Sequence, residues 1–194
     1  MKRIELVKGD ITKQEVDVIV NAAHEGLCGG GGVDGAIHKA AGSMMSGECM
    51  NLPENSKGER CPIGKCRMTS GYKLPALYIL HTVGPVWRGG KHDERTNLSF
   101  CYKSCIRMAQ LQGLHKMAFP CISTGAFNFP KKDAAEIAFN IVRDWFEYQA
   151  FITPHANDVF NETCNISLIR FVCFDNENYN EYLKLMPEKY MDIE

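Results

Sequence analysis

A strand, a glycine-rich loop and a helix follow one another in residues 17–41, which read DVIVNAAHEGLCGGGGVDGAIHKAA. The run at 17–21 is short, apolar and β-branched, as in strands buried on both faces of a parallel sheet. Apolar residues then recur at helical spacing over 34–41. The four glycines at 29–32 allow close approach of the backbone to a ligand. Because the first N–H groups of a helix are unpaired and carry partial positive charge, this stretch predicts a phosphate site.

The rest of the chain continues the alternation of strands and helices. We expect strands at 2–8, 17–21, 66–69, 77–83, 116–121 and 166–174. We expect helices at 34–41, 43–52 and 95–111, another beginning near Pro130, and a last one ending near Met186, with loops at 53–65, 86–94 and 150–164. Such an order implies an α/β fold with a largely parallel sheet covered on both faces. A chain of 194 residues that is 45% hydrophobic fits one domain, spanning 1–194, with a substantial core.

Charge and cysteine content limit the function classes. A net charge of −1 gives no basic excess for non-specific nucleic-acid binding, so a negative ligand must be held locally by backbone dipoles. We expect no membrane segment and no targeting peptide. Nine scattered cysteines, an odd number, suit reduced thiols in a cytoplasmic protein. Their spacing matches no zinc motif, so we predict no metal and no cofactor.

Three segments are expected at the carboxyl ends of strands, where ligands bind in α/β sheets. They are the turn Gly9–Thr12, the loop Asn21–Asp34 and the loop Ile122–Phe127. The last two each lead into a helix. Two helix N-termini that face each other would suit two adjacent phosphates, which predicts a pyrophosphate ligand.

Two other nucleotide motifs are rejected. The pattern Gly30-x-Gly32-x-x-Gly35 matches the dinucleotide fingerprint, but eight residues separate it from the end of the strand at Asn21. The stretch 58–65 resembles a P-loop, but it has five residues between its glycines, and Cys66 stands where Ser or Thr should follow the lysine.

Four polar residues near this edge each allow a structural and a functional interpretation. Asp34 either favours the helix N-terminus or is present for chemistry, and His38, one turn later, is a surface histidine or an orienting partner for it. Asn21 shapes a turn or binds a sugar hydroxyl. Asp10 forms an Asx turn or accepts a hydrogen bond from an exocyclic amine such as that of adenine. Their convergence on one rim favours the functional interpretations.

Aromatic and histidine residues elsewhere are less decisive. Phe127 follows a glycine-containing loop and could stack on a sugar or base, and Phe174, at the end of the last strand, is a similar candidate for adenine. We interpret His81, in an apolar strand, as a hydrogen-bonded core histidine.

Five segments together resemble the MacroD-type macrodomains, and among these the bacterial O-acetyl-ADP-ribose deacetylases. They are GDIT at 9–12, VDVIVNAA at 16–23, the stretch 29–41, HTVGPVWRGG at 81–90 and ISTG at 122–125. The resemblance implies a three-layer α/β/α sandwich with a central mixed, largely parallel sheet. It also implies an ADP-ribose cleft across the strand ends.

The resemblance assigns roles to individual residues. Asp10 would bind the adenine amino group with help from the Ile11 backbone. The pyrophosphate would be cradled by Gly30, Gly31, Gly32 and Val33 and by Ser123, Thr124, Gly125, Ala126 and Phe127. Asn21 and Asp34 would address the distal ribose, against which Phe127 would pack, so we take Asp34, Asn21 and His38 as the catalytic set.

The implied activity is hydrolysis of esters at the distal ribose. The substrates would be O-acetyl-ADP-ribose and proteins carrying mono-ADP-ribose on acidic side chains, and the chain would act as a monomer. The main alternative is a non-catalytic ADP-ribose reader, which would not need Asp34 beside the phosphates. Two departures from the family stand out, namely His24 where Asn is usual and a longer stretch at 151–163.

Overall fold

A six-stranded sheet forms the centre of the protein in the computed structural model, which describes residues 3–152 and 166–187. The strands are β1 (Arg3–Lys8), β2 (Val18–Ala22), β3 (Cys66–Ser70), β4 (Tyr78–Thr82), β5 (Lys116–Pro120) and β6 (Leu168–Cys173). They lie in the order β1-β6-β5-β2-β4-β3, and only the edge strand β3 is antiparallel to its neighbour. The predicted mixed, largely parallel sheet is confirmed.

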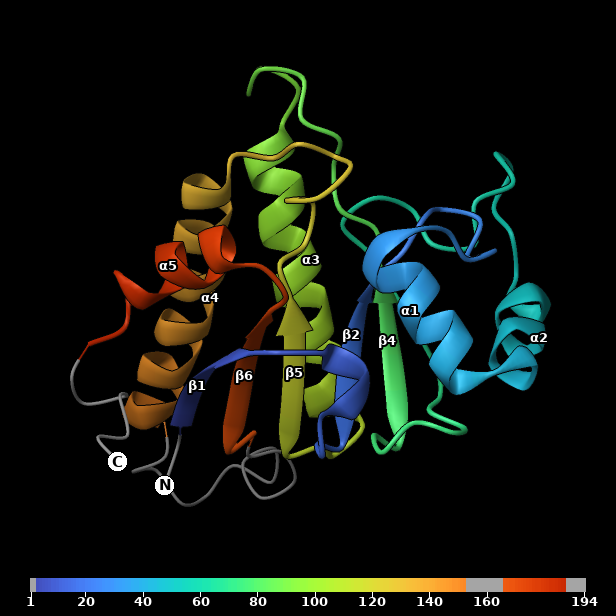
Figure 1. The fold of residues 1–194 in the computed structure, drawn as a ribbon, viewed down its shortest axis with the longest axis horizontal. Helices are drawn as coiled ribbons and strands as arrows, with labels where there is room; N and C mark the ends of the chain where they lie inside the picture. The colour runs from blue at the N-terminus through green and yellow to red at the C-terminus, as the bar shows by residue number, and fades with distance from the viewer. Residues whose placement is uncertain (1–2, 153–165, 188–194) are drawn as a thin grey trace.

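Helices cover both faces of this sheet (Figure 1). One layer holds α1 (Gly32–Ala41) and α2 (Ser43–Asn51). The other holds α3 (Glu94–Leu111), α4 (Lys131–Ile152) and α5 (Asn176–Leu183). A short 3-10 helix, η1 (Ile11–Lys13), connects β1 to β2. The architecture is therefore the three-layer α/β/α sandwich.

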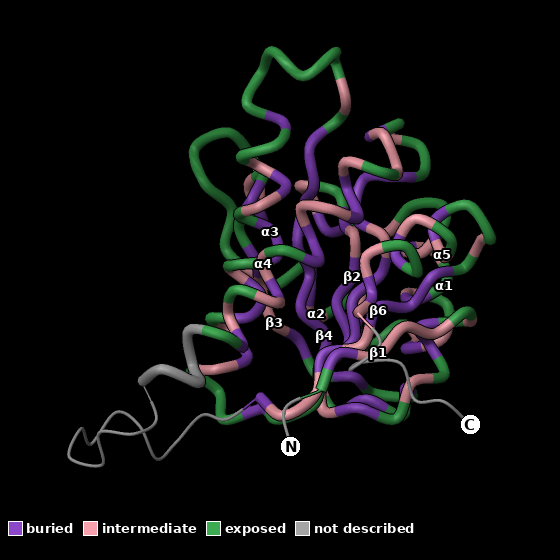
Figure 2. Tube along the Cα trace, turned by 90° about the vertical axis from the view of Figure 1, so that its left-hand side faces the viewer, coloured by how far each residue is buried: buried purple, intermediate pink, exposed green. Residues whose placement is uncertain are grey.

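Strand β2 shows why this sequence forms a central strand. Ile19 packs into the core below α1 and α2, whereas Val18 and Val20 pack into the core below α3 and α4. All three side chains are almost completely buried. Figure 2 shows the same pattern at larger scale, with buried residues concentrated in the strands and exposed residues in the peripheral loops. A continuous β-branched run is the pattern that burial on both faces requires.

Most predicted boundaries differ from the observed ones by one or two residues. Helix α1 begins at Gly32, not at residue 34, because Gly31 is extended (φ −97°, ψ −176°) and acts as the N-cap. Helix α4 continues to Ile152, so the loop predicted at 150–164 begins later than expected, and its part from 153 onward lies outside the described residues. Within the described part of the chain, no helix has the length and apolar character needed to cross a membrane.

Candidate functional site

Two adjoining cavities lie at the edge of the sheet where the parallel strands end. We name them after their acidic residues. The Asp10 cavity, of about 390 Å³, is lined by Gly9, Asp10, Ile11, Gly32, Val33, Ala36, Pro120, Cys121, Thr124, Gly125, Val172, Phe174, Asp175 and Asn178. The Asp34 cavity, of about 340 Å³, is lined by Ala22, Ala23, His24, Gly30, Gly31, Gly32, Val33, Asp34, Gly84, Cys121, Ser123, Gly125, Ala126 and Phe127. The two share Gly32, Val33, Cys121 and Gly125 and so form one cleft.

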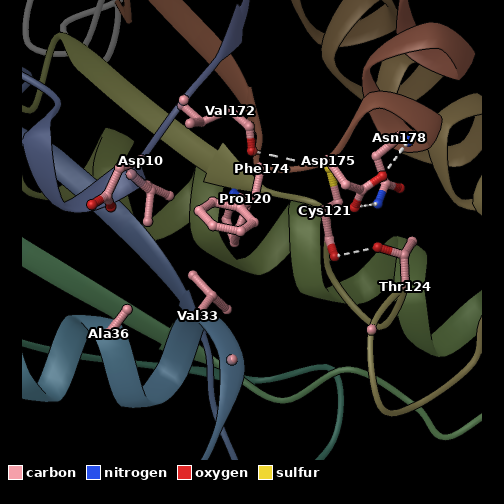
Figure 3. Close-up of a pocket in the computed structure, with 14 residues that line it drawn as sticks. Asp10, Val33, Ala36, Pro120, Cys121, Thr124, Val172, Phe174, Asp175 and Asn178 are labelled. Carbon is pink, nitrogen blue, oxygen red and sulfur yellow. Dashed lines mark hydrogen bonds between the residues drawn. The ribbon is translucent and has the colours of Figure 1, made fainter.

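The Asp10 cavity is mainly apolar. Figure 3 shows Val33, Ala36 and Phe174 around it. Phe174 follows β6 and is 85% exposed, so its ring is open for stacking. Asp10 Oδ1 accepts hydrogen bonds from Thr12 N at 2.8 Å and Thr12 Oγ1 at 2.7 Å. Its Oδ2 accepts none from the described residues. Asp10 therefore forms a turn with one oxygen and keeps the other available for a ligand.

Unpaired backbone donors line the junction of the cavities. The N–H groups of Gly31, Gly32 and Val33 donate to no atom of the described residues, as expected for the first turn of a helix. The N–H groups of Gly125, Ala126 and Phe127, on the opposite wall, are also unpaired within the described chain. Gly32 has φ of +59°, a conformation that favours glycine. Two sets of free donors thus border one cleft, which suits an anion with two charged groups.

Asp34 lies in the first turn of α1 and is 95% buried, with 5% of its surface exposed. Asn21 Nδ2 donates a hydrogen bond to its Oδ1 at 2.7 Å. His38 Nε2 lies 3.4 Å from the same oxygen without forming a hydrogen bond, and His38 Nδ1 is 3.0 Å from Ser46 Oγ. Oδ2 accepts no hydrogen bond within the described residues. One carboxyl oxygen is therefore held in place and the other is free.

Asn21 is oriented from behind by His81. The second hydrogen of Asn21 Nδ2 points to His81 Nδ1, 3.1 Å away, and His81 Nε2 is 2.8 Å from Thr69 Oγ1. Burial, with a smaller effect from His38, lowers the pKa of His81 to about 3, so the ring is neutral and Nδ1 can accept. The opposite orientation of the Asn21 amide would direct its Oδ1 at Asp34 Oδ1, so that two hydrogen-bond acceptors would face each other. The interpretation of His81 as a core histidine is confirmed, and the network also fixes Asn21.

The loop that leads into α4 forms the other wall of the Asp34 cavity. Ser123 has φ of +67°, rare for a residue other than glycine and a source of strain. A Cβ at Gly84 would lie 2.1 Å from Ser123 Oγ, so only glycine fits there. Trp87 N donates to the Phe127 carbonyl at 2.8 Å and ties the loop to the segment after β4. Helix α4 begins only at Lys131, so amides of the preceding loop, and not a second helix N-terminus, lie opposite α1. The prediction that two helix N-termini face each other was therefore wrong.

Comparison with known proteins identifies the family. The family model described as "Macro domain" matches residues 20–138. The chain belongs to the macro domain family. The resemblance found in the sequence is thereby confirmed. A macro domain-containing protein of Listeria monocytogenes is 49% identical to this macro domain over 183 residues, which cover 94% of this chain and 96% of that protein.

Two further relatives carry more specific descriptions. The O-acetyl-ADP-ribose deacetylase of Escherichia fergusonii is 45% identical to this macro domain over 187 residues, covering 96% of this chain and 97% of that enzyme. The solved structure of a Trypanosoma brucei macrodomain in complex with ADP-ribose superimposes with a TM-score of 0.77 at 37% identity. That comparison covers 94% of this macro domain and 68% of the other chain.

Most of the predicted site residues of this macro domain line the cleft. Asn21 and His38 line neither cavity. Asn21 is fully buried, and its side chain contacts Asp34 instead of the cavity. Its Oδ1 has no hydrogen-bond partner among the described residues. His38 is likewise a neighbour of Asp34, and its Nε2 has no hydrogen-bond partner among the described residues, so its orienting role stays a prediction.

Sequence reasoning missed several cleft residues of this macro domain. Cys121 lines both cavities, and Asp175 and Asn178 line the Asp10 cavity. Asp175 caps α5 by accepting from Asn178 N at 2.8 Å, a pairing that the Asp-x-x-Asn spacing could have indicated. His24 lines the Asp34 cavity. Among residues 3–152 and 166–187, no three His, Cys, Asp or Glu side chains gather closely enough to hold a metal ion.

Proposed function

We propose that this macro domain binds ADP-ribose in the cleft and hydrolyses esters at the distal ribose. The observation that carries the proposal is Asp34, a buried residue of the cavity lining that keeps one carboxyl oxygen without a hydrogen bond from the described residues, beside two sets of unpaired backbone donors. An anion cradle alone has no electrostatic use for a buried carboxylate at this position. A group that orients water or a sugar hydroxyl does need one.

The order of the two cavities matches the order of groups in ADP-ribose. The adenine would occupy the Asp10 cavity and stack on Phe174, and its amino group would donate a hydrogen bond to Asp10 Oδ2. The diphosphate would lie at the junction, beside the unpaired amides of the glycine loop and of residues 125–127. The distal ribose would then lie in the Asp34 cavity, against Phe127. Micromolar affinity, about −8 kcal/mol, is the expected strength.

The chemical step is attack of water on the ester carbonyl, which releases ADP-ribose and a carboxylic acid. Asp34 Oδ2 would orient the water and accept its proton. An alternative route is also open to this site, in which Asp34 positions the ribose while a phosphate of the substrate activates the water. Unpaired amides in both walls would hold the negative charge of the substrate without reorganisation.

Asn21 and His38 would support Asp34 from behind the cavity. Asn21 holds Oδ1 at 2.7 Å and is itself held by His81, so the direction of the carboxyl group is set by a buried network. His38 adds a polar neighbour on the same side. A carboxyl group that is fixed before substrate binds loses less entropy in the transition state.

Two substrate classes share this ester linkage. The relatives named as O-acetyl-ADP-ribose deacetylases support the acetyl ester. Proteins that carry mono-ADP-ribose on aspartate or glutamate present the same bond, with the protein as the acyl group. The modified proteins would then be the macromolecular partners, and no cofactor is needed because water is the only co-substrate.

The experiment compares turnover with binding. The purified chain is incubated with O-acetyl-ADP-ribose and, separately, with a protein modified on aspartate or glutamate, and released ADP-ribose is quantified. Release from either substrate supports the hydrolase, and the pair of results gives the substrate class. ADP-ribose binding in calorimetry without release from either substrate would favour the reader, and absence of binding at high micromolar ligand would refute both.

A further inference from the structure

Two cysteines lie side by side at the ends of neighbouring strands, and one of them, Cys121, lines the cleft. Cys121 directly follows β5, and Cys173 is the last residue of β6. The parallel register pairs Pro120 with Val172, which places Cys121 next to Cys173. Their sulfur atoms are 3.4 Å apart, with the Cys121 thiol donating to Cys173 Sγ. The proposed hydrolysis uses neither thiol.

The two thiols differ in exposure. Cys121 is partly exposed and is one of the residues that both cavities share. Cys173 is completely buried. Figure 3 shows the Cys121 sulfur directed toward β6, where the Val172 carbonyl oxygen is 4.0 Å away. Cys121 is therefore the one of the two cysteines that borders the cleft, and Cys173 lies behind it with its sulfur within reach of the Cys121 sulfur.

We propose that Cys121 and Cys173 form an oxidation site, at which a peroxide converts the two thiols to a disulfide. Formation of this disulfide and binding of a ligand in the cleft would oppose each other. Cys121 Sγ attacks one peroxide oxygen and becomes a sulfenic acid, and with hydrogen peroxide the other oxygen leaves as water. Cys173 Sγ then displaces the hydroxyl group, which leaves as a second water with the remaining thiol proton. The two thiols lose two electrons and the peroxide gains them.

Formation of the disulfide would change the junction of the two cavities. The sulfur atoms must close from 3.4 Å to about 2.05 Å, which draws the Cys121 side chain toward β6. The Cys121 carbonyl accepts from Thr124 Oγ1 at 2.9 Å, so a shift of Cys121 is passed to the loop that carries the amides of residues 125–127. A ligand at the junction covers Cys121. Binding and oxidation therefore oppose each other, and by linkage each weakens the other.

The charge around Cys121 sets the pH dependence. Its hydrogen bond to Cys173, then burial and the carboxyl group of Asp175, raise the pKa of the Cys121 thiol, which Lys131 only partly offsets. Among the described residues, Tyr102 and Tyr182 also interact with it, and both are buried with raised pKa values. Because the thiolate is the reacting form, disulfide formation should accelerate as pH rises from 7 to 9.

The test follows the linked peptide directly. The reduced full chain is exposed to hydrogen peroxide, alkylated, digested and analysed by mass spectrometry. We expect a peptide pair joined through Cys121 and Cys173, absent from Cys173→Ser and from Cys121→Ser. The matched control is Cys28→Ser, which removes an exposed thiol outside both cavities and should form the same linked pair at the same rate.

A second arm adds ADP-ribose and rests on the proposed function. At ten times its dissociation constant the ligand should slow formation of the linked pair about tenfold, because only the free form reacts. The oxidation site is refuted if Cys28 reacts fully while no linked pair forms. The competition is refuted if saturating ADP-ribose leaves the rate unchanged. If calorimetry shows no ADP-ribose binding, the proposed function fails, and the linked pair still decides the oxidation site.

Discussion

The two cavities of the cleft are built in opposite ways. In the Asp10 cavity, Asp10 and Phe174 are exposed, and within the described residues the Asp10 carboxyl group is held only by a local turn with Thr12. In the Asp34 cavity, the carboxyl group is buried and is held through Asn21 and His81 by residues from three strands. Exposed groups contribute affinity, whereas a buried, fixed group suits chemistry. The difference indicates that binding and turnover can be separated by substitution.

The sharpest test of this separation is Asp34→Ala. Loss of the carboxyl group should lower turnover of O-acetyl-ADP-ribose by about a hundredfold or more, in the range for a general base. Affinity for ADP-ribose should stay the same or improve, because a negative group near the diphosphate is removed. A fall in kcat without a loss of affinity marks a transition-state interaction. Rates of product release and calorimetry measure the two quantities.

Asn21→Ala provides the comparison for that variant. It should reduce turnover less and with a less clean separation, since it also leaves His81 Nδ1 without its donor. Near-normal turnover of the acetyl ester and the protein-linked ester by Asp34→Ala would disprove the mechanism.

A backbone substitution tests whether the amide donors join the two cavities. A Cβ at Gly35 would lie 2.4 Å from the Gly30 carbonyl oxygen, so Gly35→Ala must displace the glycine loop. We expect a loss of ADP-ribose affinity of about 2 kcal/mol, roughly thirtyfold, as charge-assisted hydrogen bonds are misdirected. Gly31→Ala is the control, because a Cβ there meets nothing within 4 Å, and its loss should be smaller. Equal losses would show that the loop position is not what matters.

Asp10→Asn should affect the other cavity alone. Asn keeps an oxygen for the turn with Thr12 but replaces the free acceptor by a donor, which cannot accept from the adenine amine. We expect about a tenfold rise in the dissociation constant of ADP-ribose and a similar rise in KM, with kcat nearly unchanged. Calorimetry and initial rates test this. A large fall in kcat would mean that the two cavities are not separate in function.

The buried network behind Asp34 makes a pH prediction for stability. The pKa of His81 is about 3 in the folded protein and about 6.5 when unfolded, so between these values the unfolded chain binds more protons. Stability is therefore full above pH 6.5 and falls as pH falls. Between pH 6.5 and 5.5 the loss should be about 1 kcal/mol, roughly fivefold in the unfolding equilibrium constant.

Denaturant unfolding at both pH values, on wild type and His81→Gln, measures this effect. The variant should show a flatter dependence. The chosen range avoids Glu94. Burial raises the pKa of its carboxyl group, but hydrogen bonds from backbone N–H groups lower it to about 2, so Glu94 affects stability only below its unfolded pKa of 4.5. An identical pH dependence in both proteins would mean that His81 is not the group responsible.

The smallest expected effect is that of a chelator. Since the sequence predicts no metal, turnover of either ester should be unchanged by EDTA. Loss of activity that returns when a divalent metal is added would contradict the assignment of the chemistry to Asp34 and water.

The fold was largely predictable because its signals are local. The β-branched run of β2 and the helical spacing of α1 are consequences of burial on one or two faces. Element ends were less accurate, since the start of α1 depends on the extended backbone of Gly31 and not on residue type. The strand order is not local either. Nothing in the alternation places β6 between β1 and β5.

The site divides in the same way. The glycine loop and Asp34 lie within one short stretch, and their joint function could be predicted. Cys121 and Cys173 are neighbours only because β5 and β6 pair, so sequence reasoning could not bring them together. His81 was understood as a core residue, but its contact with Asn21 depends on the pairing of β2 with β4.

The four residues shared by the cavities have one more consequence. Gly32, Val33, Cys121 and Gly125 fix the distance between the two ends of the cleft, so a ligand that fills both is bivalent. Once one end is seated, the other is presented at an effective concentration set by the length of the connecting group. A synthetic molecule that joins an adenine-like group to a ribose-like group gains this advantage only when its linker spans the shared rim.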